Sequence, residues 1–213
     1  MRKILPYLRL ATALALALSV VWQVTDRLIN NVFRPGEYFA YFTIQTSIIA
    51  AVVLAAAGVR ELQGKADTKA LNLAKLSVSS YAIVVAVVYN ALLRGTVVQL
   101  GEPDYGYVWP VLPNEILHVW APFFIVLDFA LTKTTTKLKF KQIFWILAFP
   151  MAWLAFTIIR GILTDWWAYW FLNPNEEAGV GGVAVFIMII VVFGLVSASI
   201  SLGLNKLITK AKA

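Results

Sequence analysis

The sequence predicts an all-α fold in which six transmembrane helices form one bundle and a single domain over residues 1–213. Three observations lead to this prediction: 61% of the residues are hydrophobic, only 14% are charged, and the mean hydropathy is +0.78. Soluble domains carry about 25% charged residues, and disordered chains combine low hydrophobicity with high net charge. The composition therefore excludes a soluble globular protein and a disordered chain.

Six apolar segments are each long enough to cross a bilayer, which takes about 20 residues of helix. The connections between them are short and polar, so none has room for a separate soluble domain. The predicted spans cover residues 8–28, 38–59, 70–93, 112–132, 142–160 and 180–204.

The first segment begins like a secretory signal peptide, with Arg2 and Lys3 before an apolar run. The run continues as far as Trp22, however, and no small-x-small cleavage site ends it. We therefore expect a retained first helix.

The direction of the helices follows from the lysines and arginines, of which 14 of 18 lie at one end of the predicted spans. Positive charge stays on the cytoplasmic side during insertion, so we expect both termini to be cytoplasmic. The formal charge of +7 then reflects topology and attraction to anionic lipid headgroups rather than nucleic-acid binding. The expected location is the plasma membrane, if the protein is bacterial. The four basic residues at the opposite end are Arg27, Arg34, Arg94 and Arg160.

The residue inventory excludes several kinds of chemistry. The chain has no cysteine and one histidine, which excludes disulfides, thiol catalysis and metal sites that need thiolates or a histidine pair. We expect no cofactor and no metal. The expected partners are a lipid substrate and bilayer lipids, with no obligate protein partner.

Polar residues inside a span are costly and are functional candidates by default. His118, the only histidine, lies about six residues, or about 9 Å, below the outer end of the fourth span. Thr43 lies about five residues into the second span, at a similar depth by the same rise. A hydroxyl and an imidazole at one depth are the parts of a nucleophilic acyl-transfer site. The simpler alternative is a histidine that hydrogen-bonds between helices beside an ordinary threonine.

Three further residues are candidates for orienting the base or stabilising an oxyanion. Glu115 lies one helical turn above His118 on the same face, and Asn90 and Arg160 lie near the same layer because their spans end on the outer side. Spacing alone does not choose among the hydroxyls of this layer. The rivals of Thr43 are Thr46, Thr157 and Thr164.

An aromatic run, DWWAYWF at residues 165–171, follows the fifth span. Tryptophan and tyrosine gather at membrane interfaces, so an interfacial belt is the favoured interpretation. The alternative is a lid over a cavity that faces outward.

Three sequence blocks, taken together and in this order, resemble one known family. They are YFAYFTIQTS at residues 38–47, EILHVWAPFFIVLDF at 115–129 and WWAYWFLNP at 166–174. The chain resembles the androgen-induced and androgen-dependent TFPI-regulating membrane proteins and their bacterial relatives. The resemblance implies a membrane threonine hydrolase that cleaves fatty acid esters of hydroxy fatty acids or similar lipids. It matches the family's nucleophile to Thr43 and the partner histidine to His118.

The sequence thus predicts an intramembrane hydrolase of ester-linked lipids with Thr43 as nucleophile and His118 as base. The alternative is a non-enzymatic membrane protein that binds or transports a lipid or another small molecule. Such transporters often contain two matching interrupted spans, and no clear pair is found in this sequence.

Overall fold

The computed structural model describes residues 4–95, 104–132 and 138–211, and this part of the chain is helical without strands. The long helices are α1 (Leu5–Ile29), α3 (Phe42–Leu62), α4 (Lys69–Val88), α6 (Ala121–Leu131), α7 (Ala148–Thr164) and α8 (Gly179–Ala211). The shorter segments are α2 (Pro35–Tyr38), α5 (Val111–Glu115), the π-helical turns η1 (Tyr89–Leu93) and η2 (Ile116–Trp120), and the 3-10 segments η3 (Phe140–Leu147) and η4 (Trp170–Leu172).

Within the described residues, six helices are long and apolar enough to cross a membrane. They confirm the predicted all-α fold and its six spans. Every predicted boundary lies within four residues of the observed one, and the second span shows one of the largest differences: it begins at Phe42 instead of residue 38.

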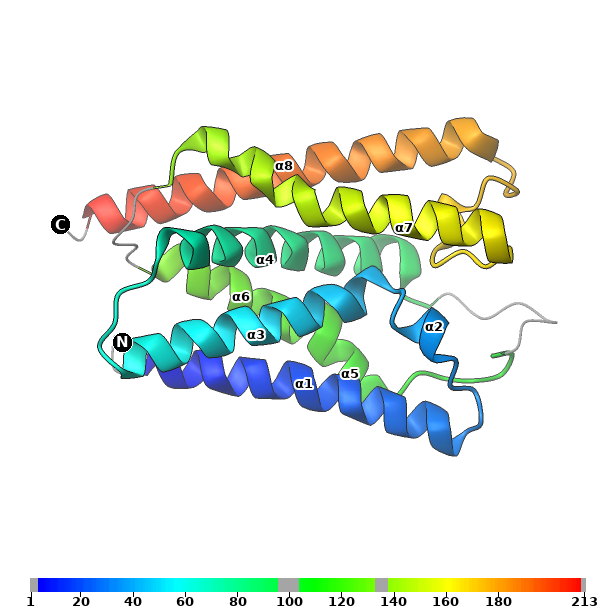
Figure 1. The fold of residues 1–213 in the computed structure, drawn as a ribbon, viewed down its shortest axis with the longest axis horizontal. Helices are drawn as coiled ribbons and strands as arrows, with labels where there is room; N and C mark the ends of the chain where they lie inside the picture. The colour runs from blue at the N-terminus through cyan, green and yellow to red at the C-terminus, as the bar shows by residue number, and fades with distance from the viewer. Residues whose placement is uncertain (1–3, 96–103, 133–137, 212–213) are drawn as a thin grey trace.

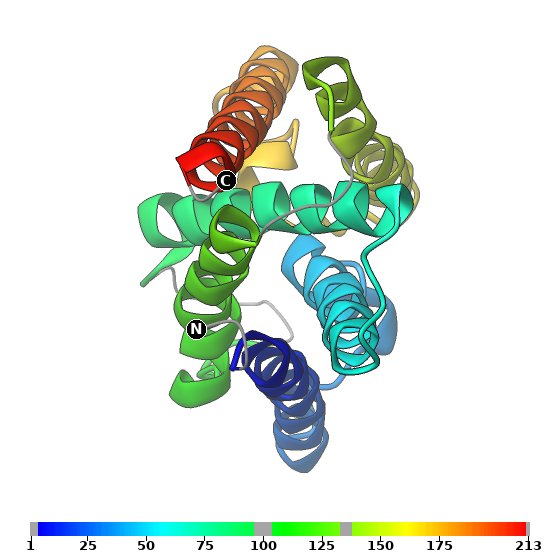
Figure 2. The same ribbon diagram turned by 90° about the vertical axis from the view of Figure 1, so that its left-hand side faces the viewer.

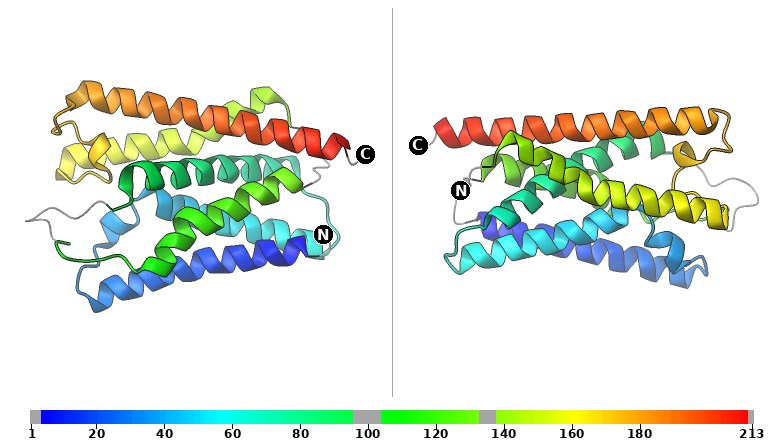
Figure 3. Two further views of the ribbon diagram at one scale, coloured as in Figure 1. Left: turned by 180° about the vertical axis from the view of Figure 1, so that it is seen from behind. Right: turned by 45° about the horizontal axis from the view of Figure 1, so that its top comes forward.

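Helix α4 runs through the middle of the bundle, with α1, α3 and α6 on one side and α7 and α8 on the other (Figures 1 and 2). Helix α1 packs along α3, and α4 contacts α3, α6 and α8. The beginning of α1 and the end of α8 lie at the same end of the bundle (Figure 3), as an even number of spans requires.

A buried ionic cluster joins three helices at the end that holds the chain termini. Arg9 is 3% exposed, and its guanidinium donates to Asp128 Oδ1 at 2.8 Å, to Glu61 Oε2 at 2.6 Å and to Thr132 Oγ1 at 2.6 Å. A guanidinium is suited to this role because its donors form a rigid fork. The cluster ties α1 to α3 and α6.

A second ionic cluster lies at the opposite end. Arg27 and Arg34 both donate to the carboxylate of Asp104. The Arg27 guanidinium also lies over the rings of Tyr107 and Trp109, at 5.0 and 4.7 Å from the ring centroids. These contacts hold the segment before α5 against the end of α1.

Candidate functional site

Thr43 is the second residue of α3. The helix begins here because Pro35–Tyr38 forms the separate helix α2 and Tyr41 is extended, with φ −62° and ψ 133°. No side chain caps this end of α3, and the first N–H groups of a helix have no acceptor within it. The Thr43 side chain, 7% exposed, therefore lies beside free backbone donors.

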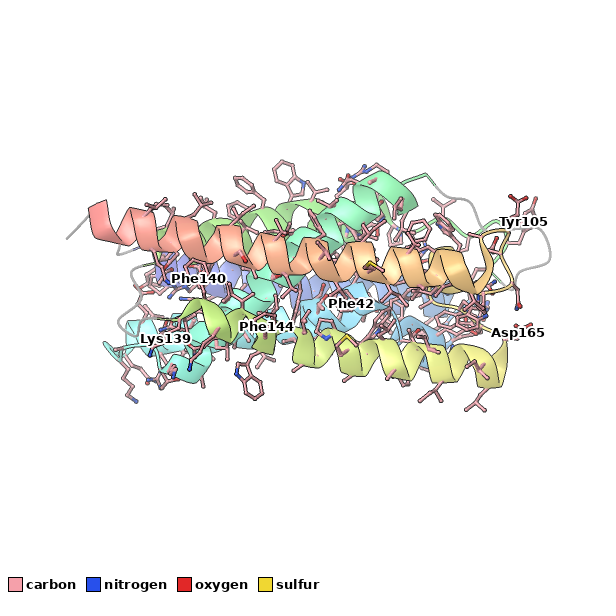
Figure 4. All side chains as sticks on the ribbon, turned by 90° about the horizontal axis from the view of Figure 1, so that it is seen from above. Phe42, Tyr105, Lys139, Phe140, Phe144 and Asp165 are labelled. Atoms are coloured by element: carbon pink, nitrogen blue, oxygen red, sulfur yellow. The ribbon has the colours of Figure 1, made fainter. Side chains whose placement is uncertain are left out.

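Two side-chain hydrogen bonds stabilise the break between α2 and α3. The Trp153 indole N–H donates to the carbonyl of Ala40 at 2.8 Å, and the Gln45 amide donates to the carbonyl of Phe39 at 2.8 Å. Non-helical backbone at membrane depth needs such partners because lipid supplies none. Phe42, next to Thr43, lies inside the bundle, between the end marked by Lys139 and the end marked by Tyr105 and Asp165 (Figure 4).

Thr43 lines a cavity of about 680 Å³, its open part included, between α4, α7 and α8. Apart from Thr43 and two tyrosines, the described residues that line it are apolar or, like Trp153, have their polar group already bonded. Examples are Val85, Leu154 and Ile190. Such a lining suits an acyl chain and not a polar solute.

We infer that the cavity opens on the side of the bundle beside Met151. This side chain lines the cavity and is also 48% exposed. Residues of α7 and α8 line the cavity, and both helices expose large apolar side chains such as Phe156 and Met188. In a membrane, this opening faces lipid.

The aromatic segment after α7 covers the cavity. Tyr169, Phe171 and Leu172 line it, and Phe171 and Leu172 are buried, whereas Trp170 is exposed. An interfacial belt would leave these side chains at the surface, so this part of the segment fits the lid interpretation better. Trp167 anchors the segment by packing against Gly161 of α7.

His118 lies in the π-helical turn η2 and is 9% exposed. Its Nδ1 lies 2.8 Å from the carbonyl oxygen of Asn114. Because a carbonyl only accepts hydrogen bonds, Nδ1 carries a proton in this contact, and Nε2 of the neutral ring is free to accept one. The backbone thus orients the imidazole as a base at Nε2.

Tyr89 connects His118 with the cavity. The Tyr89 ring stacks on the imidazole with centroids 3.9 Å apart and planes at 20°, and it lines the same cavity as Thr43. The Asn114 amide donates to the Tyr89 hydroxyl at 2.7 Å, so Asn114 contacts both rings. Among the described residues, no hydrogen bond joins Thr43 directly to His118.

The three other predicted site residues lie elsewhere. Glu115 forms an ion pair with Arg94 at 2.8 Å, and Asn90 accepts from the same arginine at 2.8 Å. Arg160 lies over the ring of Trp166 at 4.2 Å. None of the three is among the described residues that line the cavity, and neither are the rival hydroxyls Thr46, Thr157 and Thr164.

Sequence reasoning missed the contributions of Tyr89, Asn114 and Tyr169. Asn114 lies four residues before His118, on the same helical face, and this spacing was a usable signal. Tyr169 had no such signal, because its place in the cavity depends on how the segment after α7 folds back onto α3.

No protein-family profile, no curated protein and no solved structure matches this chain. The resemblance based on the three sequence blocks therefore stays a prediction, and function is argued from the site itself.

Proposed function

We propose that the protein is an intramembrane hydrolase of ester-linked lipids that uses Thr43 as nucleophile and His118 as general base. One observation carries the proposal: Thr43 lies at the uncapped start of a helix, inside an apolar cavity that opens toward lipid beside Met151. The resemblance to the membrane threonine hydrolases agrees with this assignment and names fatty acid esters of hydroxy fatty acids as a substrate class.

In the proposed reaction, Thr43 Oγ1 bonds to the ester carbonyl carbon while its proton passes to His118 Nε2. The carbonyl then re-forms, the bond to the leaving alkoxide breaks, and His118 returns the proton to it. Water attacks the acyl-threonine by the same route and releases the fatty acid. Because Thr43 and His118 share no direct hydrogen bond, the proton either passes through one bridging water molecule, or the two side chains move into direct contact when substrate binds.

A lipid substrate fits the access route. Its acyl chain enters the apolar cavity sideways from the bilayer, past Met151, while its polar part stays near the end of the bundle that holds Tyr105 and Asp165. We propose that this end is the outer one and that both termini are cytoplasmic in the plasma membrane, because the basic residues gather at the terminal end.

A second candidate is a lipid-binding or lipid-transporting protein without catalysis. The apolar lining and the absence of a Thr43–His118 hydrogen bond among the described residues favour it. In that case, Thr43 is a packing residue and its substitution leaves lipid binding intact.

The test treats the purified protein in lipid nanodiscs with a fluorophosphonate and with p-nitrophenyl octanoate. We expect covalent labelling and hydrolysis in the parent, and neither in Thr43→Ala. Thr46→Ala is the matched control, since it removes the same hydroxyl one turn further along, where it donates to the carbonyl of Phe42 at 2.8 Å. Equal labelling of the parent and Thr43→Ala would contradict the assigned nucleophile, and no reaction of the parent would favour the lipid-binding candidate.

A further inference from the structure

The stacked rings of Tyr89 and His118 both belong to π-helical turns. Tyr89 is the first residue of η1, and His118 lies in the middle of η2. At the end of η1, the Arg94 N–H donates to the carbonyl of Tyr89 at 2.7 Å. At the end of η2, the Ala121 N–H donates to the carbonyl of Ile116. Each bond spans five residues instead of four, and such turns inside α-helices are frequent at functional sites.

Three contacts join Tyr89, His118 and Asn114 in a closed loop. The Tyr89 ring stacks on the imidazole with centroids 3.9 Å apart. The backbone carbonyl of Asn114 accepts the proton of His118 Nδ1 at 2.8 Å, and the side-chain amide of Asn114 donates to the Tyr89 hydroxyl at 2.7 Å. Each of the three residues therefore holds the other two.

The stack and the hydrogen bond fix different properties of the imidazole. The bond to the Asn114 carbonyl fixes the position of Nδ1, but a ring held at one atom can still tilt about that contact. The Tyr89 ring removes this freedom, because the two planes lie face to face at 20°. A tilt would displace Nε2 most, since this atom lies across the ring from Nδ1.

Tyr89 is itself held, although it borders an open space. It lines the cavity, and His118 is not among the described residues that do. The Asn114 amide holds the Tyr89 hydroxyl, and the Arg94 guanidinium lies over the Tyr89 ring at 5.0 Å from its centroid. Arg94 in turn pairs with Glu115 at 2.8 Å. These contacts keep the ring on the imidazole and out of the cavity.

We propose that Tyr89 is a positioning residue whose ring fixes the plane of the His118 imidazole, so that Nε2 is aligned to accept the Thr43 proton. This inference rests on the proposed hydrolase function. Tyr89 takes up no proton and forms no covalent bond in the reaction. Its loss leaves the base in place but misaligned, so the chemical step slows while substrate binding is kept.

The first test measures kcat and KM for p-nitrophenyl octanoate in nanodiscs. Tyr89→Phe keeps the stack and loses the hydrogen bond to Asn114, and we expect a loss of about 10-fold in kcat. Tyr89→Leu also loses the stack, and we expect a loss of about 100-fold, because a misplacement of about 1 Å can cost that much. Both variants keep an apolar cavity wall, so KM should change little.

Tyr81→Phe is the matched control. It removes a tyrosine hydroxyl from the same transmembrane helix, where this group donates to the carbonyl of Ile146 at 2.6 Å. Tyr81 is not among the described residues that line the cavity. We expect this control to retain the kcat of the parent.

Asn114→Leu breaks the same hydrogen bond from the other side and leaves the backbone carbonyl that holds His118. We expect Asn114→Leu and Tyr89→Phe to lose similar factors in kcat, and the double variant to lose no more than either, because both remove one interaction. Losses that multiply in the double variant would contradict the closed loop.

A second readout follows the imidazole without using hydrolysis. Diethyl pyrocarbonate transfers its ethoxycarbonyl group to a free imidazole nitrogen, and the chain has one histidine, so the ultraviolet absorbance of the product reports His118 alone. His118→Gln gives the background. We expect slow modification of the parent, in which His118 is buried, and faster modification of Tyr89→Leu, because the lost ring opens the imidazole to the cavity.

The outcomes separate the two proposals. A parent that hydrolyses the ester while both Tyr89 variants keep its kcat would overturn the role of Tyr89 and leave the hydrolase intact. Modification of Tyr89→Leu at the rate of the parent would likewise overturn that role. A parent that is inactive and unlabelled by fluorophosphonate would overturn both.

Discussion

Asn114 shows how one residue can prepare another for chemistry. Its carbonyl holds the proton of His118 on Nδ1, and its amide holds the Tyr89 hydroxyl. The sequence predicts Glu115 for the orienting role because a carboxylate one turn away is a common partner of a catalytic histidine. In the structure, the Glu115 carboxylate pairs with Arg94, and the backbone supplies the acceptor.

Thr43 and His118 should behave as one catalytic unit. We expect Thr43→Ala and His118→Ala each to remove most hydrolysis of p-nitrophenyl octanoate, and the double variant to lose little more, because parts of one unit are not additive. The measurement is kcat/KM for the parent, both single variants and the double variant. Losses that multiply in the double variant would show that the two residues act independently.

At the scale of helices, the aromatic segment that covers the cavity packs closely against α7 at Gly161. A Cβ atom at Gly161 would lie 2.5 Å from the Trp167 ring, which is shorter than any ordinary contact. The structure has no room for a side chain here, and the ring is held by the helix that it covers.

Gly161→Ala should therefore lift the aromatic segment from α7. Overpacking of this kind costs about 1–3 kcal/mol, so we expect a melting temperature several degrees below that of the parent and faster proteolysis within residues 165–178. Gly203→Ala is the control, since nothing lies within 4 Å of the added atom. Equal melting temperatures for the two variants would contradict the packing argument.

The ionic cluster around Arg9 should matter for stability because it is buried. Arg9→Met leaves the carboxylate of Asp128 without its arginine, and removing one partner of a buried pair costs about 3–5 kcal/mol. We expect a marked drop in thermal stability in nanodiscs, with partial recovery in the double variant Arg9→Met, Asp128→Asn. A double variant less stable than Arg9→Met would contradict this explanation.

For the whole molecule, hydropathy predicted six spans because a bilayer demands a fixed length of apolar helix. It did not predict the break at residues 39–41, because that break depends on hydrogen bonds from Gln45 and from Trp153 of a distant helix. The similar depth of Thr43 and His118 in their predicted spans likewise suggested that they form a pair. Depth does not show, however, how each helix is rotated about its own axis. The sequence therefore could not reveal that Tyr89 stacks on His118 or that Tyr89 and Tyr169 line the same cavity as Thr43.

The orientation in the membrane is a separate prediction. The chain contains no cysteine, so single cysteines introduced at Lys139 and Asp165, which lie at opposite ends of the bundle, can be probed in intact cells. A membrane-impermeant maleimide should label Asp165→Cys without permeabilisation and Lys139→Cys only after it. The reverse pattern would invert the topology.

In the proposed reaction, the opening beside Met151 separates the supplies of the two reactants. The ester would arrive by diffusion within the plane of the bilayer, whereas the water that hydrolyses it would come from the polar end of the bundle. Turnover should then follow the mole fraction of ester among the surrounding lipids and not its amount per litre. Inert lipid added at constant total ester would slow the reaction by surface dilution, even though nothing in the protein or the substrate had changed.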